Sequence, residues 1–164
     1  MDSIDKFNKL SKAEFISIFR NIFEKTEWIA ERCYESKPYN NLDELVSKMM
    51  KIFENIEKER HLEILNSHPD LAVEKKLTED SKNEQKNASL NQCTDEEFVE
   101  FKKLNEKYKK KFGFPFIIAV KGKNKEEILN SFRQRIANNI NLEFIEAKKQ
   151  VKKIAIFRLS EIIK

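Results

Sequence analysis

The chain has 164 residues, of which 40% are hydrophobic and 37% charged, enough for one domain with a buried core. Only 2 Gly and 3 Pro occur. Because β-rich folds need many turns, this scarcity argues against an all-β protein and favours long helices with short links. The net charge of +4 arises from 32 basic and 28 acidic residues with interleaved signs, so we expect a mixed, solvated surface.

No feature of the sequence divides the chain or directs it to a membrane. It contains no Gly/Ser-rich linker, repeat or low-complexity tract, so we predict one domain over residues 1–164. The N-terminus lacks the basic and apolar regions of a signal peptide, and no apolar stretch has membrane-spanning length. We therefore expect a cytoplasmic protein without a membrane partner. Cys33 and Cys93 are isolated, which predicts reduced thiols and no metal site.

The first third of the chain has apolar residues at helical spacing. Phenylalanine and isoleucine predict a first helix from about Ser11 to Lys25. Thr26 is the N-cap candidate of a second helix, which must end before Pro38. Leucine, valine and methionine at the same spacing predict a third helix over residues 42–56.

His68 lies directly before one of the three prolines, in Ser67-His68-Pro69-Asp70-Leu71-Ala72. Because the residue before proline is disfavoured in the α region, the short helix predicted over residues 61–65 must stop near His68. The imidazole should therefore project from a helix end. Imidazoles titrate near neutral pH, which suits proton transfer. His61 carries no motif and is expected at the surface.

A second polar group follows in Ser81-Lys82-Asn83-Glu84-Gln85. Ser81, Glu84 and Gln85 stand at positions i, i+3 and i+4, which lie on one face of a helix. A hydroxyl, a carboxylate and a carboxamide on one face are seldom needed for packing alone. Together with the histidine, this pattern indicates that the chain performs chemistry.

The second half opens with a capping box, Thr94 followed three residues later by Glu97. The helix that begins there should end at Gly113. The apolar run of residues 114–120 could be a strand, but no second strand is evident to pair with it. We predict a buried, partly extended Phe-Gly-Phe-Pro-Phe segment, whose backbone groups need other partners. A polar ligand could supply some of them.

Two further helices are predicted over residues 128–136 and 142–162. The apolar positions of the last helix, in which we include Leu142 and Ile145, place Arg158 on the face that should be buried. An unpaired buried charge costs several kcal/mol, so an inward arginine needs an anion or several carbonyls. The fold class is therefore predicted to be all-α, a single-domain bundle of many helices.

His68, Glu84 and Arg158 are three polar groups that helical patterning directs toward one interior, although spacing alone does not bring them together. Each also has a structural interpretation. The histidine could be a satisfied residue at a helix end, and the carboxylate part of an ordinary helix start. The arginine could form a structural ion pair, and residues 114–120 could simply be core.

The basic run Lys107-Tyr108-Lys109-Lys110-Lys111 is typical of a helix C-terminus, where cations complement the helix dipole. Nucleic-acid binding is the alternative. No basic surface with interleaved aromatic residues accompanies this run, so we expect no nucleic-acid partner.

Six blocks of the sequence, in order, resemble the OHCU decarboxylase family, whose substrate is 2-oxo-4-hydroxy-4-carboxy-5-ureidoimidazoline (OHCU). The similar blocks are Glu27-Trp28-Ile29-Ala30-Glu31-Arg32, Lys37-Pro38-Tyr39, the His-Pro-Asp-Leu motif at residues 68–71, the Ser-x-x-Glu-Gln motif at residues 81–85, Leu104-Asn105-Glu106-Lys107-Tyr108 with Phe112-Gly113-Phe114-Pro115-Phe116, and Lys153-Ile154-Ala155-Ile156-Phe157-Arg158-Leu159. The spacer after the histidine motif looks shorter than in the family.

The resemblance implies an all-α enzyme of urate catabolism that decarboxylates OHCU to (S)-allantoin with no metal or organic cofactor. It implies that His68 is the general acid, that Glu84 hydrogen-bonds the substrate and orients the histidine, and that Arg158 stabilises negative charge. It also suggests a homodimer. The residues that it implies for substrate binding are Pro69, Ser81, Lys82, Asn83, Glu84, Gln85, Phe116, Ile117, Ile118, Ala119 and Val120. The alternative function is a helical module that binds a ureido or purine-derived ligand without turnover.

Overall fold

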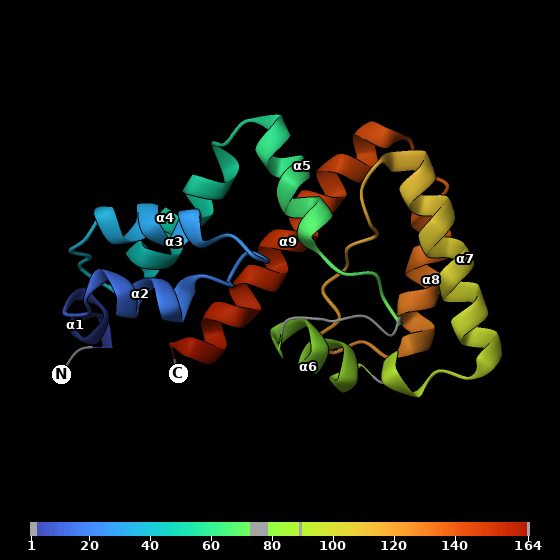
Figure 1. The fold of residues 1–164 in the computed structure, drawn as a ribbon, viewed down its shortest axis with the longest axis horizontal. Helices are drawn as coiled ribbons and strands as arrows, with labels where there is room; N and C mark the ends of the chain where they lie inside the picture. The colour runs from blue at the N-terminus through green and yellow to red at the C-terminus, as the bar shows by residue number, and fades with distance from the viewer. Residues whose placement is uncertain (1–2, 73–78, 89, 164) are drawn as a thin grey trace. The chain divides into compact units, whose positions relative to one another are not determined.

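The computed structural model describes residues 3–72, 79–88 and 90–163. Over these residues it contains nine α-helices, one 3₁₀-helix and no strand, which confirms the predicted all-α class (Figure 1). The helices are α1 (Ser3–Asn8), α2 (Lys12–Phe19), α3 (Glu27–Glu35), α4 (Leu42–Glu54), α5 (Lys58–Ser67), α6 (Glu79–Asn87), α7 (Asp95–Phe112), α8 (Lys125–Arg135) and α9 (Ile140–Ile162), and the 3₁₀-helix η1 is Leu90–Gln92.

The chain forms two compact units, residues 1–64 with 152–164 and residues 65–151. In the first unit, α2, α3 and α4 lie side by side (Figure 1). Its core is aromatic: Phe15 and Phe19 have ring centroids 4.6 Å apart, and Phe23 stacks on Phe53 at 4.8 Å. Burial of such large rings is the main stabilising contribution available to a unit of this size.

The second unit has a separate aromatic core between α7 and α8. Tyr108 and Phe101 of α7 are fully buried, and Phe132 of α8 lies 5.8 Å from the Tyr108 ring and 3.9 Å from the Phe116 ring. The limits of α7 agree with the sequence. Thr94 and Glu97 form the predicted capping box, and Gly113 ends the helix in the left-handed conformation with φ 80°.

The first predicted helix is shorter than its apolar pattern suggests, because α2 ends at Phe19 rather than Lys25. Lys25 adopts a positive φ of 54°, and its N–H donates to the Asn21 side chain. The turn that replaces the last helical residues buries Glu24 completely. Apolar residues therefore continue at helical spacing after Phe19, although the backbone there is no longer helical.

The predicted burial is wrong at three positions. His61 is buried, not at the surface, and its Nε2 is 2.7 Å from the Phe53 carbonyl oxygen, which requires the N–H to lie on that nitrogen. Leu142 and Ile145 are more than half exposed. The inner face of α9 begins instead with Glu143, a charged residue that periodicity does not place inside.

Across the described residues, none of the helices combines the length and the apolar character needed to span a membrane.

Cys33 is expected to resist alkylation in the folded protein. Its side chain is fully buried, and this burial raises the pKa of its thiol from 9.0 to about 12. At pH 8 the thiolate fraction is then lower by about a thousandfold than for an ordinary thiol. Iodoacetamide kinetics followed by mass spectrometry, with the protein in urea as control, would measure this. Alkylation of Cys33 in the native protein as fast as in urea would contradict the prediction.

Candidate active site

His68 follows directly after the last residue of α5, as the proline at position 69 predicts. Its N–H donates to the Leu65 carbonyl at 3.2 Å, and its side chain is buried, with 8% of the residue exposed. Pro69 beside it is half-buried. The chain leaves this point in non-helical conformation and reaches a positive φ of 54° at Ala72. The imidazole thus stands at a sharp change of chain direction.

The backbone after His68 is held by side chains of α6 and α7. Gln85 donates from Nε2 to the Asp70 carbonyl at 3.2 Å and accepts the Ala72 N–H at 3.1 Å. Asn105 donates to the Leu71 carbonyl at 3.1 Å. Buried side-chain amides hold three consecutive backbone positions, so residues 70–72 have a defined conformation. The backbone of His68, two residues earlier, is thereby held on its C-terminal side.

Asp70 extends this support through its side chain. Its carboxylate oxygen Oδ2 lies 2.6 Å from Nζ of Lys109, and the carboxylate side chain is only 10% exposed. Lys109 belongs to the basic run that the sequence assigned to a helix C-terminus, and α7 does end three residues later. One lysine of that run therefore has a specific role in the same unit as His68.

Replacing Asn105 by leucine is expected to loosen the loop. The substitution keeps the size of the side chain but leaves the Leu71 carbonyl buried without its donor, which costs about 1–3 kcal/mol of unfolding free energy. Urea denaturation would measure the loss, with Lys102→Leu, an exposed position on the same helix, as control. Equal midpoints for the two variants would show that the amide does not hold the loop.

Residues Ser81, Glu84 and Gln85 lie on α6, so they share a helix face as predicted. Ser81 and Gln85 are its buried residues, and Glu84 is half-buried. Lys82 and Asn83, which the resemblance also placed in the substrate site, are exposed. The polar atoms of Gln85 are both used on the backbone of the 70–72 loop, so the structure gives this residue a positioning role.

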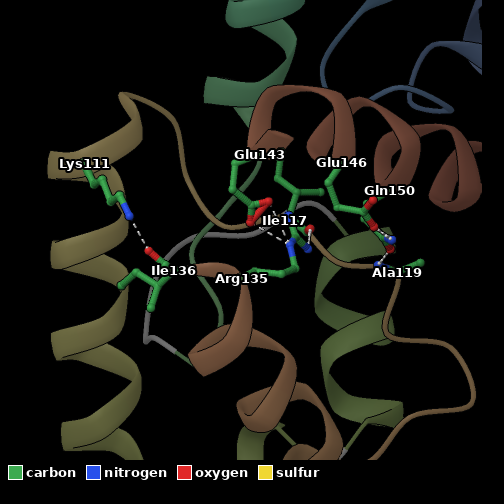
Figure 2. Close-up of polar contacts among 8 residues, drawn as sticks. All are labelled: Lys111, Ile117, Ala119, Arg135, Ile136, Glu143, Glu146 and Gln150. Carbon is green, nitrogen blue, oxygen red and sulfur yellow. Dashed lines mark hydrogen bonds and ion pairs between the residues drawn. The ribbon is translucent and has the colours of Figure 1, made fainter. Parts of the chain in front are cut away.

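Residues 116–120 are all buried and lie outside any helix. Figure 2 shows two of their backbone groups bound by side chains of the same unit. The Ile117 carbonyl accepts from Nη1 of Arg135 at 2.6 Å, and the Ala119 N–H donates to Oε1 of Gln150 at 3.0 Å. Part of the partners that the sequence required for this segment are therefore protein side chains.

Arg135 and Glu143 form a buried ion pair that the sequence analysis missed. Nε of Arg135 is 2.8 Å and 3.1 Å from the two oxygens of Glu143, whose side chain is fully buried. Burial raises the pKa of the neighbouring Tyr108 hydroxyl above its usual value, and the positive charge of Arg135 offsets this rise only in part. The signal was present: Arg135 continues the stripe of Ile128 and Phe132 on α8, by the same spacing argument that was applied to Arg158.

Arg158 lies in the first unit and is buried, as predicted. Its Nη2 is 2.8 Å from Oε2 of Glu24, and its Nη1 donates to the Asn21 carbonyl at 2.7 Å. The buried guanidinium has both the anion and the carbonyl that its position demands. Its action together with His68 and Glu84 stays a prediction.

No group of three or more His, Cys, Asp or Glu side chains in the described part of the chain is arranged to hold a metal ion. The second unit offers an imidazole, a carboxylate, a hydroxyl and backbone amide groups from the residues named above. Such a set can donate and accept protons and can bind the edges of a polar heterocycle.

Solved structures of similar fold carry related descriptions. The chain aligns with a crystal structure of (S)-allantoin synthase with a TM-score of 0.80 and 28% identity, over 100% of this chain and 54% of that one. A crystal structure of OHCU decarboxylase in the presence of (S)-allantoin aligns with a TM-score of 0.74 and 25% identity, over 88% of this chain and 96% of that one.

Proteins that are similar to this chain in sequence carry descriptions related to those of the solved structures. The chain is 41% identical over 164 residues to the uric acid degradation bifunctional protein of Bacillus sp. (strain TB-90), of which it spans 33%. It is 35% identical over 159 residues to the 2-oxo-4-hydroxy-4-carboxy-5-ureidoimidazoline decarboxylase of Haloferax volcanii, covering 97% of this chain and 95% of that protein. The family profile described as OHCU decarboxylase matches residues 8–160. The chain therefore belongs to the OHCU decarboxylase family.

Proposed function

We propose that this protein decarboxylates OHCU to (S)-allantoin in urate degradation, using no metal or organic cofactor. The observation that carries the proposal is the placement of His68 and the Ser81–Glu84–Gln85 face within one compact unit of a chain that belongs to this family. The names of the relatives, which refer to uric acid degradation and to OHCU decarboxylase, support it.

The chemistry requires little of the protein beyond orientation and charge stabilisation. The substrate carboxylate stands on a carbon that also carries a hydroxyl, beside centres that accept electrons. Loss of CO₂ leaves a carbanion delocalised into the ring, which must then be protonated on one face. An enzyme accelerates this by aligning the carboxylate with the π system, by stabilising the developing charge, and by placing an acid on one side.

His68 is the proposed general acid, because an imidazole exchanges protons at neutral pH and its backbone is anchored at residues 65 and 70–72. Glu84 would accept hydrogen bonds from the hydroxyl or ureido N–H groups of the substrate and keep the histidine in its working tautomer. Arg158 would stabilise negative charge on the substrate; charge-assisted hydrogen bonds contribute about 1.5–3 kcal/mol each.

The remaining predicted residues would bind rather than react. Ser81 would fix the ring and the ureido arm, together with the second Nε2 hydrogen and the second Oε1 lone pair of Gln85, which the 70–72 loop does not use. Pro69 would line the site. Residues 116–120 would offer backbone groups to the amide edges of the heterocycle. The exposed Lys82 and Asn83 are the members of the proposed set with the least support from their placement.

The proposal is tested by mixing the purified protein with freshly generated OHCU. Circular dichroism follows the optically active product, since uncatalysed decay of OHCU gives racemic allantoin with no net signal. A fast rise of the (S)-allantoin signal is the expected result. Thermal stabilisation by ureides without any product would instead identify a binding module, and the proposed reaction would be wrong.

A further inference from the structure

The turn between α2 and α3 provides two partners for the guanidinium of Arg158. Nη2 of Arg158 lies 2.8 Å from Oε2 of Glu24, and Nη1 donates to the Asn21 carbonyl at 2.7 Å. All three residues belong to the first unit. Because the two contacts use different nitrogens of one rigid, planar group, they fix both the plane of the guanidinium and its rotation within that plane.

The turn itself is held by contacts that do not involve Arg158. The Lys25 N–H donates to the side chain of Asn21 at 3.0 Å, and the ring of Phe23 is buried in the aromatic core of the unit. Glu24 lies between these two anchored positions. Its backbone is therefore fixed on both sides, and its fully buried carboxylate has a defined place.

Stability alone gives little reason for an ion pair at this position. Most other buried side chains of the unit are apolar. Two charges that leave water lose their hydration, so a buried ion pair is often no more stabilising than apolar side chains of the same volume. What the pair provides is direction, because at 0% and 5% exposure solvent hardly screens the two side chains or competes for their hydrogen bonds.

We propose that Glu24 is a positioning residue, which orients the guanidinium of Arg158 toward the negative charge that develops on the substrate ring as CO₂ leaves. This inference rests on the proposed function, because it requires that Arg158 contacts the substrate. A displacement of about 1 Å in such an oriented group can lower a rate by about 10². Loss of an interaction made only in the transition state lowers kcat and kcat/KM equally and leaves KM unchanged.

The test measures the steady-state kinetics of OHCU decarboxylation in three variants. Glu24→Asp keeps the charge but is one methylene shorter, so its carboxylate displaces the guanidinium or loses it, and we expect kcat to fall about 10- to 100-fold at unchanged KM. Glu24→Gln keeps the length and an acceptor oxygen, so its kcat should exceed that of Glu24→Asp by about tenfold. Glu54→Asp is the control, because it makes the same change in the exposed pair with Lys152 and should match the wild type.

A second measurement separates positioning from a general disturbance of the fold. The product (S)-allantoin has lost the carboxylate and carries no negative charge. Its inhibition constant as a product should therefore change by less than about twofold in Glu24→Asp. The assays contain trimethylamine N-oxide, which favours the folded state, and rates are divided by the folded fraction, so that a loss of stability does not pass for a loss of activity.

The outcomes separate this inference from the proposed function. A lower kcat in Glu24→Asp, with KM and (S)-allantoin inhibition unchanged and with recovery in Glu24→Gln, supports the inference. A kcat of Glu24→Asp within about twofold of the Glu54→Asp control overturns it and leaves the function standing. A loss of kcat that is accompanied by a raised KM and weaker product inhibition also overturns it, since the role of Glu24 is then only structural. A wild-type protein that does not convert OHCU overturns both.

Discussion

Replacing His68 by asparagine is expected to lower kcat for OHCU decarboxylation by about 10²–10⁴, the range that a positioned general acid contributes. Asparagine can still hydrogen-bond but has no proton to exchange near neutral pH. The backbone at this position is held by its own contacts to Leu65 and by the anchored 70–72 loop, so the variant should fold. The measurement is the initial rate of the (S)-allantoin signal in circular dichroism.

Glu84→Gln provides the matching test of the carboxylate. It is isosteric, lies on a half-buried helical position, and removes only the charge and the acceptor pair. We expect most of the conversion to be lost here too. Lys86→Gln, an exposed position on the same helix outside the proposed site, is the control that should retain its rate. Rates like the wild type in both His68→Asn and Glu84→Gln would reject the roles assigned to these residues.

The second large effect concerns stability. Glu24→Gln should lower the free energy of unfolding by about 3–5 kcal/mol, because it removes the negative charge of a fully buried carboxylate that pairs with the buried guanidinium of Arg158. The side chains of this pair are 0% and 5% exposed, and Arg158 also binds the Asn21 carbonyl. The loss is measured by urea unfolding of the purified variant.

The same unit supplies a matched control. Glu54 and Lys152 form an ion pair of similar length, 2.7 Å, but their side chains are 47% and 36% exposed. Solvent screens such a pair, so Glu54→Gln should cost about 1 kcal/mol or less. If Glu24→Gln is no more destabilised than Glu54→Gln, burial of the pair does not have the consequence described here, and Arg158 depends on other contacts.

The sequence predicted best those features that follow from local chemistry. The capping box at Thr94 and the glycine after α7 define a helix because each satisfies terminal backbone groups, whatever surrounds it. The end of α5 before Pro69 follows from a steric clash within two residues. The face shared by Ser81 and Gln85 follows from helix geometry alone.

The predictions that were wrong concern positions whose structure depends on residues distant in the sequence. The first helix stops at Phe19 although its apolar spacing continues, and the turn that follows buries Glu24, which pairs with Arg158 at the other end of the chain. His61 is inside because the Phe53 carbonyl accepts from its ring. Glu143, the partner of Arg135, was missed because Leu142 and Ile145 were assigned to the inner face of α9, although both are exposed.

The attachment of α6 has a consequence for the energy landscape of the second unit. The buried side chains of this helix are those of Ser81 and Gln85, and neither is apolar. A helix secured by polar contacts rather than by hydrophobic burial detaches at a lower free-energy cost than its neighbours. Local unfolding of the second unit should therefore begin with α6, the helix that carries Glu84. A substrate bound to Glu84 would stabilise the attached position of this helix and so suppress the opening.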